Sequence, residues 1–164
     1  MKVFDIAPVK FTGGKMLILD QTKLPGEEVY IEAITKEDVW DAIYHLKVRG
    51  APAIGVAAGY GLYISVRDYQ AETAAEFAAY VKETADYLNS SRPTAVNLSW
   101  ALKRMVKVME EYLAGCEDAV AMGEELPEER RFTGLRKYSA WKQKRFIRKT
   151  KMRALPWVST ACHC

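Results

Sequence analysis

The pattern of apolar and polar positions changes character along the chain, from strand-like at the start to helical after residue 35. Val9–Phe11 and Met16–Asp20 flank two consecutive glycines, Gly13 and Gly14, which supply positive φ at no steric cost, so these segments predict a β-hairpin. A further segment, Val29–Ile34, is rich in β-branched and aromatic residues and follows a Pro-Gly turn. We therefore expect a short N-terminal sheet built on a hairpin.

From Thr35 onwards, apolar residues recur at helical spacing. Thr35 can cap the first helix, with Asp38 as a weaker substitute for the usual Glu of a capping box. Pro52 and Pro93 each suit the first position of a helix, where a missing N–H costs nothing. Four helices are expected, over residues 36–49, 52–66, 71–88 and 93–115. The fold class predicted is therefore α+β, a small sheet followed by a bundle of about four helices.

Composition places the chain among soluble globular proteins, since 49% of its 164 residues are hydrophobic and 27% are charged. No apolar run approaches the roughly 18 residues that a membrane-spanning helix needs, and the start lacks the plan of a secretory signal. Its three cysteines cannot form a disulfide framework. We therefore expect a cytoplasmic protein that does not bind a membrane.

Charge divides the chain unevenly, because residues 130–164 hold many Lys and Arg residues and no acid, although the net charge is only +3. Such asymmetry indicates either a nucleic-acid-binding tail or two parts of different origin. It led us to divide the chain into residues 1–114, a connecting segment 115–129 and a basic tail 130–164.

Two arginines stand directly before a proline-opened helix, in Arg49-Gly50-Ala51-Pro52 and at Arg92. Helix N-termini present unpaired N–H groups, so an adjacent guanidinium makes a good cradle for a phosphate. Gly50 would let such a ligand approach the backbone closely. The alternative is ordinary helix punctuation with solvated arginines, and spacing by itself favours that alternative because helix starts are far commoner than phosphate sites.

Other candidate positions favour structural roles. The spacing of Gly55 and Gly59 indicates close helix packing, and Asp20-Gln21 is typical of a turn. His45 has no second ligand at metal-binding spacing, so we expect it to be structural and expect no metal. No phosphate-binding glycine loop of the known nucleotide-binding types occurs, and we expect no cofactor.

Three segments taken together resemble the N-terminal region of the methylthioribose-1-phosphate isomerases. They are LILDQTKLPGE at Leu17–Glu27, VRGAPAIG at Val48–Gly55 and SRPTAVNL at Ser91–Leu98, in the same order and spacing as in that family. The resemblance covers residues 1–114, roughly the first third of a member. It implies a small N-terminal domain that is normally followed by a Rossmann-like domain, which we expect to be absent here.

The resemblance also implies an activity. Family members convert 5-methylthioribose 1-phosphate into 5-methylthioribulose 1-phosphate in methionine salvage, as homodimers without metal or nucleotide. Matching the motifs assigns substrate binding to Arg49, Gly50, Ala51 and Arg92. These residues include both arginines that the helix-terminus argument singles out.

The family's catalytic residues have no counterpart here. Its cysteine lies in a Leu-Thr-His-Cys-Asn-type segment and its aspartate in a Gly-Ala-Asp-Arg-type segment, and neither occurs in this chain. Cys162 has a similar composition around it but in a different order, so we assign it no catalytic role. We expect an inactive N-terminal fragment of an aldose–ketose isomerase, with no catalytic residue of its own.

Two alternatives remain open. Regulatory subunits of the initiation-factor exchange complex share the family fold, so the chain could be a regulatory or binding protein. The basic tail could instead bind nucleic acid.

We favour another interpretation of the tail, a shifted reading frame. When the last base of each codon is joined to the first two bases of the next codon, the tail can encode Glu-Ala-Lys-Ala-Ile-His-x-Glu-Asp-Glu-Asp from Trp141 onwards. That sequence resembles an acidic helix of the family, so we expect the tail to be disordered and not to bind nucleic acid.

Overall fold

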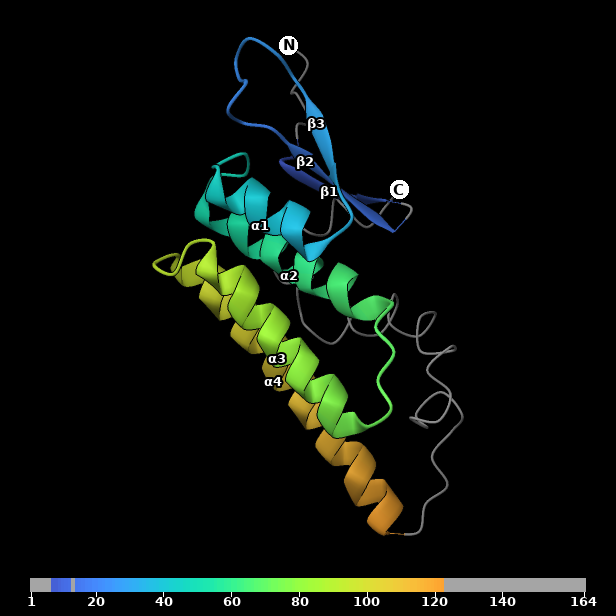
Figure 1. The fold of residues 1–164 in the computed structure, drawn as a ribbon. Coiled ribbons are helices and arrows are strands. Elements are labelled where there is room, and N and C mark those ends of the chain that lie inside the picture. The colour runs from blue at the N-terminus through green and yellow to red at the C-terminus, as the bar shows by residue number, and fades with distance from the viewer. Residues whose placement is uncertain (1–6, 13, 123–164) are drawn as a thin grey trace.

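The computed structural model describes residues 7–12 and 14–122 and opens with a small antiparallel sheet (Figure 1). Its three strands are β1 (Val9–Thr12), β2 (Lys15–Leu19) and β3 (Tyr30–Ala33), in the order β1-β2-β3. Ile18 of β2 pairs with Val9 on one side and with Ile31 on the other. The predicted hairpin and the third strand are thus confirmed.

The hairpin turn is held against the helices. Gly14 has a φ of +79°, a backbone conformation that L side chains rarely adopt, as the paired glycines predicted. Its carbonyl accepts a hydrogen bond from Nη1 of Arg67, at the last residue of the second helix. The N-terminal sheet is therefore fastened to the helical part of the chain through this turn.

Four helices follow the sheet, as predicted, and the α+β class is confirmed. They are α1 (Lys36–Tyr44), α2 (Ala51–Arg67), α3 (Ala74–Ser90) and α4 (Val96–Ala121). The Thr35 hydroxyl accepts from the backbone N–H of Asp38 at 3.1 Å, and an Asp38 carboxylate oxygen accepts from the Thr35 N–H at 2.9 Å. The predicted capping box is therefore present at the start of α1.

The bounds of α1 and α4 differ most from the prediction. α1 ends at Tyr44 rather than near residue 49, because Leu46 adopts a φ of +58° that no right-handed helix contains. α4 begins at Val96 rather than at Pro93, since the N–H of Ala95 donates to the carbonyl of Arg92 at 2.9 Å and closes a turn there. α4 also continues past residue 115 to Ala121.

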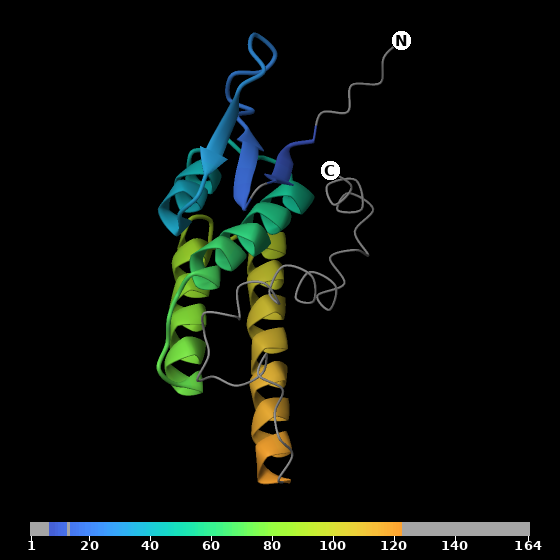
Figure 2. The same ribbon diagram turned by 90° about the vertical axis from the view of Figure 1, so that its right-hand side faces the viewer.

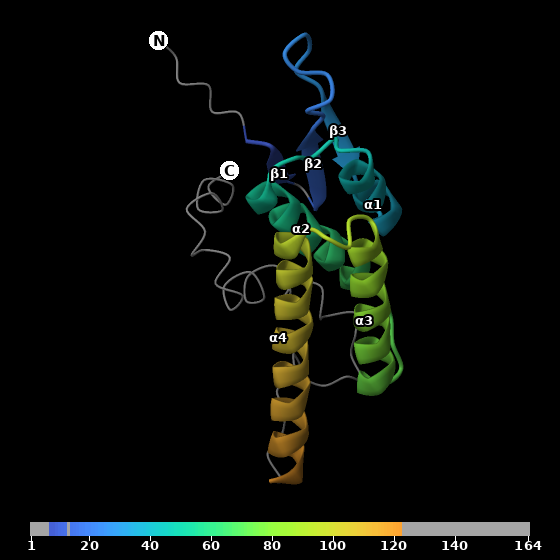
Figure 3. The same ribbon diagram turned by 90° about the vertical axis from the view of Figure 1, so that its left-hand side faces the viewer.

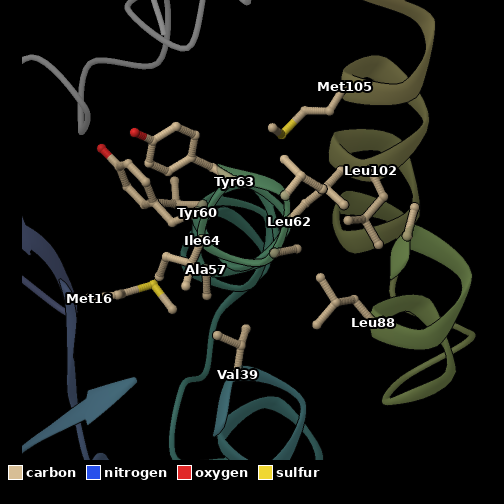
Figure 4. Close-up of a cluster of buried hydrophobic side chains, with 14 of the residues drawn as sticks. Met16, Val39, Ala57, Tyr60, Leu62, Tyr63, Ile64, Leu88, Leu102 and Met105 are labelled. Carbon is tan, nitrogen blue, oxygen red and sulfur yellow. The ribbon is translucent and has the colours of Figure 1, made fainter. Parts of the chain in front are cut away.

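α2 is the centre of the molecule, with the sheet and α1 on one side and α3 and α4 on the other (Figures 1 and 4). Side chains from four other elements point towards it: Met16 from β2, Val39 from α1, Leu88 from α3, and Leu102 and Met105 from α4. All five are at most 4% exposed. This burial explains how a helix weakened by glycines remains stable, because helices in proteins gain most of their stability from packing.

The glycines of α2 permit that packing. A Cβ atom added at Gly61 would lie 2.6 Å from Cγ1 of Val39, and one added at Gly55 would lie 3.1 Å from the carbonyl oxygen of Asn97. The predicted role of the small residues in close packing is thus confirmed at Gly55. α3 and α4 run side by side, and α4 extends beyond the end of α3 (Figures 2 and 3). Within the described residues, no helix is both long and apolar enough to cross a bilayer.

Candidate anion site at the start of the second helix

The three segments that carry the family resemblance meet at one end of α2. The backbone N–H of Gln21, in the first segment, donates to the carbonyl of Lys47 at 2.9 Å, immediately before the second segment. Gly55, in the second segment, contacts Asn97 of the third. The connections α1–α2 and α3–α4 accordingly lie at the same end of the helices (Figure 1). Segments up to 80 residues apart in the sequence therefore form one surface region.

Gly50 shapes the start of α2. It is the N-cap residue, with φ +86° and ψ 132°, and no side chain caps the helix. A Cβ atom at Gly50 would meet no atom within 4 Å, so the approach to the helix terminus is open. Arg49, Gly50, Ala51 and Pro52 are all exposed. Uncapped N–H groups at an open helix start favour an anion, because they carry the positive end of the helix dipole.

Arg49 offers a free guanidinium fork at this terminus. Its Nε donates to the carbonyl of Leu46 at 3.1 Å, which ties the inner part of the guanidinium to the connection between α1 and α2. Among the described residues, neither terminal nitrogen of Arg49 has a hydrogen-bond or ion-pair partner. Two parallel N–H groups are therefore available for a bidentate contact with a phosphate or carboxylate.

Arg92 lies four residues before α4 begins at Val96, whereas Arg49 lies two residues before α2. It is half-buried in the turn that precedes the helix, where its N–H donates to the carbonyl of Asn89 at 3.3 Å. Within the described residues its side chain has no hydrogen-bond or ion-pair partner. The contact of Gly55 with Asn97 brings the first turns of α2 and α4 together. Convergence of the Arg49 and Arg92 guanidinium groups on one cleft stays a prediction.

An ion-pair cluster borders Arg49, and the sequence interpretation did not single it out. Nζ of Lys47 lies 2.5 Å from Oδ2 of Asp41, and Nδ1 of His45 lies 2.9 Å from Oδ1 of the same carboxylate. The hydrogen bond from Lys47 lowers the pKa of Asp41 below its ordinary value. The only signal in the sequence was the four-residue spacing of Asp41 and His45, which places two side chains on one helix face.

The positions given structural roles by the sequence behave accordingly. The Asp20 carboxylate is 5% exposed and accepts from the N–H of Thr22 at 3.0 Å and from its hydroxyl at 2.6 Å, so it closes a turn. The Thr22 hydroxyl lowers the pKa of Asp20. His45 is the C-cap residue of α1, and no cluster of metal-ligating side chains occurs in the part of the chain that the structure describes.

A separate groove of about 300 Å³ lies between α3 and α4, and neither Arg49 nor Arg92 lines it. Its lining mixes both charges, and Lys82 pairs with Glu110 across it at 2.7 Å. Oppositely charged side chains that satisfy one another leave little net attraction for a charged ligand. The basic tail and Cys162 lie outside the described residues.

Comparison with known proteins identifies the family to which this chain belongs. A model of the Initiation factor 2 subunit family matches residues 47–137, more than half of the chain, and the chain belongs to that family. The match includes the segments that contain Arg49 and Arg92. The resemblance seen in the sequence is therefore confirmed at the level of the family.

Similar sequences in the family are named as sugar-phosphate isomerases. The chain is 53% identical over 121 residues to a 5-deoxyribose 1-phosphate isomerase of Moorella thermoacetica, covering 74% of this chain and 34% of the relative. It is 53% identical over 94 residues to a methylthioribose-1-phosphate isomerase of Parabacteroides distasonis, covering 57% of this chain and 28% of the relative. The chain thus spans about a third of the length of these relatives.

Two solved structures have a similar fold. The 5-methylthioribose 1-phosphate isomerase of Pyrococcus horikoshii OT3 matches with a TM-score of 0.64 at 30% identity, over 87% of this chain and 36% of that one. Subunit delta of the translation initiation factor eIF-2B from A. fulgidus matches with a TM-score of 0.61 at 28% identity, over 88% and 37%. Enzymes and initiation-factor subunits therefore share this arrangement of strands and helices.

Proposed function

We propose that this chain is the N-terminal part of an isomerase that acts on a ribose 1-phosphate modified at C5, with 5-methylthioribose 1-phosphate as the substrate. The observation that carries the proposal is the open start of α2, where Gly50 at positive φ leaves the helix terminus uncapped beside the free fork of Arg49. The 53% identity to relatives named as isomerases of such sugar phosphates supports it.

The substrate roles follow from the charge of the ligand. A sugar 1-phosphate carries about two negative charges near neutral pH, which suit the helix terminus at Gly50 and Ala51 together with Arg49 and Arg92. Held there, the phosphate fixes the sugar so that C1 and C2 face the groups that move protons. Such orientation lowers the entropic part of the barrier and leaves the proton transfers to an acid and a base.

We further propose that the 164 residues as given bind substrate without turning it over. Aldose–ketose isomerisation moves a proton between C1 and C2 and therefore requires a general acid and base. The cysteine and aspartate segments that the family uses do not occur in the sequence. Two arginines at a helix start supply orientation alone, and the purified chain should show no isomerisation above the buffer rate.

Binding can be measured on the chain itself. Inorganic phosphate and 5-methylthioribose 1-phosphate are titrated against ¹⁵N-labelled protein, with Arg49→Gln and Arg92→Gln as test variants and Lys103→Gln as the charge-matched control. We expect each arginine variant to weaken binding about tenfold, the size of a lost charge-assisted contact, and the control to leave it within twofold. Unchanged binding in both arginine variants would refute the site.

A regulatory role in an initiation-factor complex is the second candidate, and the fold of the A. fulgidus subunit favours it. The same titration separates the isomerase from the regulatory subunit, because a purely structural subunit has no need of a sugar-phosphate site.

For the complete protein we propose a cytoplasmic homodimer, in keeping with the family resemblance.

The tail proposal concerns residues 130–164. The family match ends at residue 137, inside the basic segment, and a change of reading frame within that segment would account for its end. Resequencing the gene through codons 125 to 164 tests it, and an intact frame would refute it. Salt-sensitive nucleic-acid binding that is lost on deleting residues 130–164 would instead establish the tail as a binding arm.

A further inference from the structure

The connection between α1 and α2, residues 45–50, carries Arg49 and is held in one conformation by the structure around it. The N–H of Val48 donates to the carbonyl of Ala42 at 3.2 Å, and the Val48 side chain is fully buried. Leu46 adopts the left-handed conformation that reverses the chain after α1. The backbone on the N-terminal side of Arg49 is therefore anchored in the core.

The side-chain anchor of this connection is Asp41. Its two carboxylate oxygens lie against different residues of the connection: Oδ1 is 2.9 Å from Nδ1 of His45, and Oδ2 accepts from Nζ of Lys47 at 2.5 Å. Asp41 itself belongs to α1, which is fixed at its start by the capping box. One carboxylate on a rigid helix thus holds both ends of the segment His45–Lys47.

The restraint continues from Lys47 towards the candidate site. The carbonyl of Lys47 accepts from the N–H of Gln21 at 2.9 Å, which joins the connection to the turn after β2. The carbonyl of Leu46, between the two residues that Asp41 holds, accepts from Nε of Arg49 at 3.1 Å. A shift of the segment 45–47 would therefore move the acceptor that orients the Arg49 guanidinium.

We propose that Asp41 is a positioning residue for anion binding by Arg49, acting through Lys47 and the carbonyl of Leu46. The inference rests on the proposed function, because it assigns the cause of the Arg49 geometry on which that function depends. The effect of Asp41 on affinity would come from preorganisation, because a guanidinium already aimed at the ligand loses less conformational freedom on binding. The Asp41–Lys47 pair is partly exposed, and such pairs contribute little to stability.

Simple electrostatics predicts that removing Asp41 has the opposite effect on anion binding, so the direction of the change tests the proposal. Asp41 is a negative charge close to a site for anions, so Coulomb's law by itself predicts that removing it tightens phosphate binding. It would also release the ammonium of Lys47. If Asp41 positions Arg49, the same substitution weakens binding in spite of the improved charge. The sign of the change therefore distinguishes the two effects.

The experiment uses the full 164-residue chain, with inorganic phosphate and 5-methylthioribose 1-phosphate as probes. We expect Asp41→Asn to weaken the binding of both probes about fivefold. The double variant Asp41→Asn/Lys47→Gln keeps the net charge and should weaken the binding of both probes at least as much. Asp86→Asn on α3 is the charge-matched control and should leave affinity within twofold. Asp38→Asn replaces the carboxylate of the capping box on the same helix by a neutral amide, a weaker acceptor for the Thr35 N–H. It therefore controls for loss of stability and should lower the melting temperature without changing affinity.

A second measurement keeps the test independent of affinity. The Nε–H of Arg49 can be followed by ¹⁵N NMR. Its hydrogen should exchange slowly with solvent in the wild type and in Asp38→Asn, and faster in Asp41→Asn. Equal or tighter phosphate binding by Asp41→Asn, or an unchanged Arg49 Nε–H signal, would overturn the positioning role. If neither Arg49→Gln nor Arg92→Gln changes phosphate binding, the proposed function fails, and the Nε–H signal still decides whether Asp41 orients Arg49.

Discussion

A Cβ atom on Gly55 would lie 3.1 Å from the carbonyl oxygen of Asn97, so the first turns of α2 and α4 are in direct contact at a position without a side chain. The contact joins the segment that contains Arg49 to the segment that contains Arg92. Because Asn97 meets this position with its backbone, it cannot yield by a change of rotamer. The relative placement of the two arginines therefore depends on a glycine at position 55.

Gly55→Val should consequently separate α2 from α4. Overpacking of a buried contact costs about 1–3 kcal/mol, and valine here adds three carbons against a backbone oxygen. We expect the free energy of unfolding, measured in urea, to fall by about 2 kcal/mol and phosphate binding to weaken as well. Ala53→Val, two residues earlier at a half-buried position on a different face of α2, is the control for β-branching in a helix. An equal loss in both variants would contradict the role of the contact.

The strain at Leu46 gives a second prediction. Leucine rarely adopts positive φ, and a left-handed residue other than glycine costs about 1–2 kcal/mol. Leu46→Gly and Leu46→Ala both remove the exposed leucine side chain, but only glycine relieves the backbone. We expect Leu46→Gly to be about 1 kcal/mol more stable than Leu46→Ala in urea denaturation. The reverse order would show that the φ of +58° is not a source of strain.

The features predicted correctly from the sequence are those set by near neighbours. The Gly13-Gly14 turn and the Thr35–Asp38 capping box involve residues within four positions of one another, so their pattern is visible in the chain. The end of α1 was not predictable, because it depends on a leucine in a conformation that its side chain disfavours. Pro93 suited a helix start, but the turn between Arg92 and Ala95 delays α4 by three residues.

For the candidate site, the sequence indicated the residues that we propose bind the ligand, and not Asp41, which we propose positions Arg49. Arg49 and Gly50 stand next to a proline-opened helix, a pattern with a physical meaning for anions. Asp41 lies on an amphipathic helix, where a charged residue is ordinarily solvated, and its partner Lys47 follows after a change of chain direction. Such a contact across a turn has no fixed spacing, so only the three-dimensional structure shows it.

Thr84 provides a third prediction. It is fully buried on α3, and its hydroxyl has no hydrogen-bond partner among the described residues. A buried polar group without a partner costs about 1–3 kcal/mol, and valine has nearly the same shape. We expect Thr84→Val to stabilise the protein by about 1 kcal/mol.

The control for Thr84→Val is the same substitution at Thr73. The Thr73 hydroxyl accepts from the N–H of Glu76 at 3.1 Å and caps α3. Thr73→Val should therefore destabilise the protein by about 1 kcal/mol. Both variants are compared with the wild type by urea denaturation, and a loss of stability in Thr84→Val would mean that its hydroxyl has a partner in solution.

Acid should remove the contribution of Asp41 to stability. Because the hydrogen bond from Lys47 lowers the pKa of Asp41 in the folded state, the folded protein binds this proton less readily than the unfolded chain. The stabilisation is therefore fully present above the unfolded pKa of about 3.9 and is lost as the pH falls through the lower folded value. Asp20, Asp38 and Glu76 also have lowered pKa values, so the variant Asp41→Asn is needed to isolate one group.

The measurement is the difference in free energy of unfolding between the wild type and Asp41→Asn, from neutral pH down to about pH 2.5. It should be constant above about pH 5 and shrink below it, since protonated aspartic acid and asparagine are both neutral. Lys47→Gln removes the main cause of the pKa shift, so the difference between Lys47→Gln and Lys47→Gln/Asp41→Asn should change less over the same range. A difference that stays constant, or grows as the pH falls, would show that Lys47 does not stabilise the Asp41 carboxylate in solution.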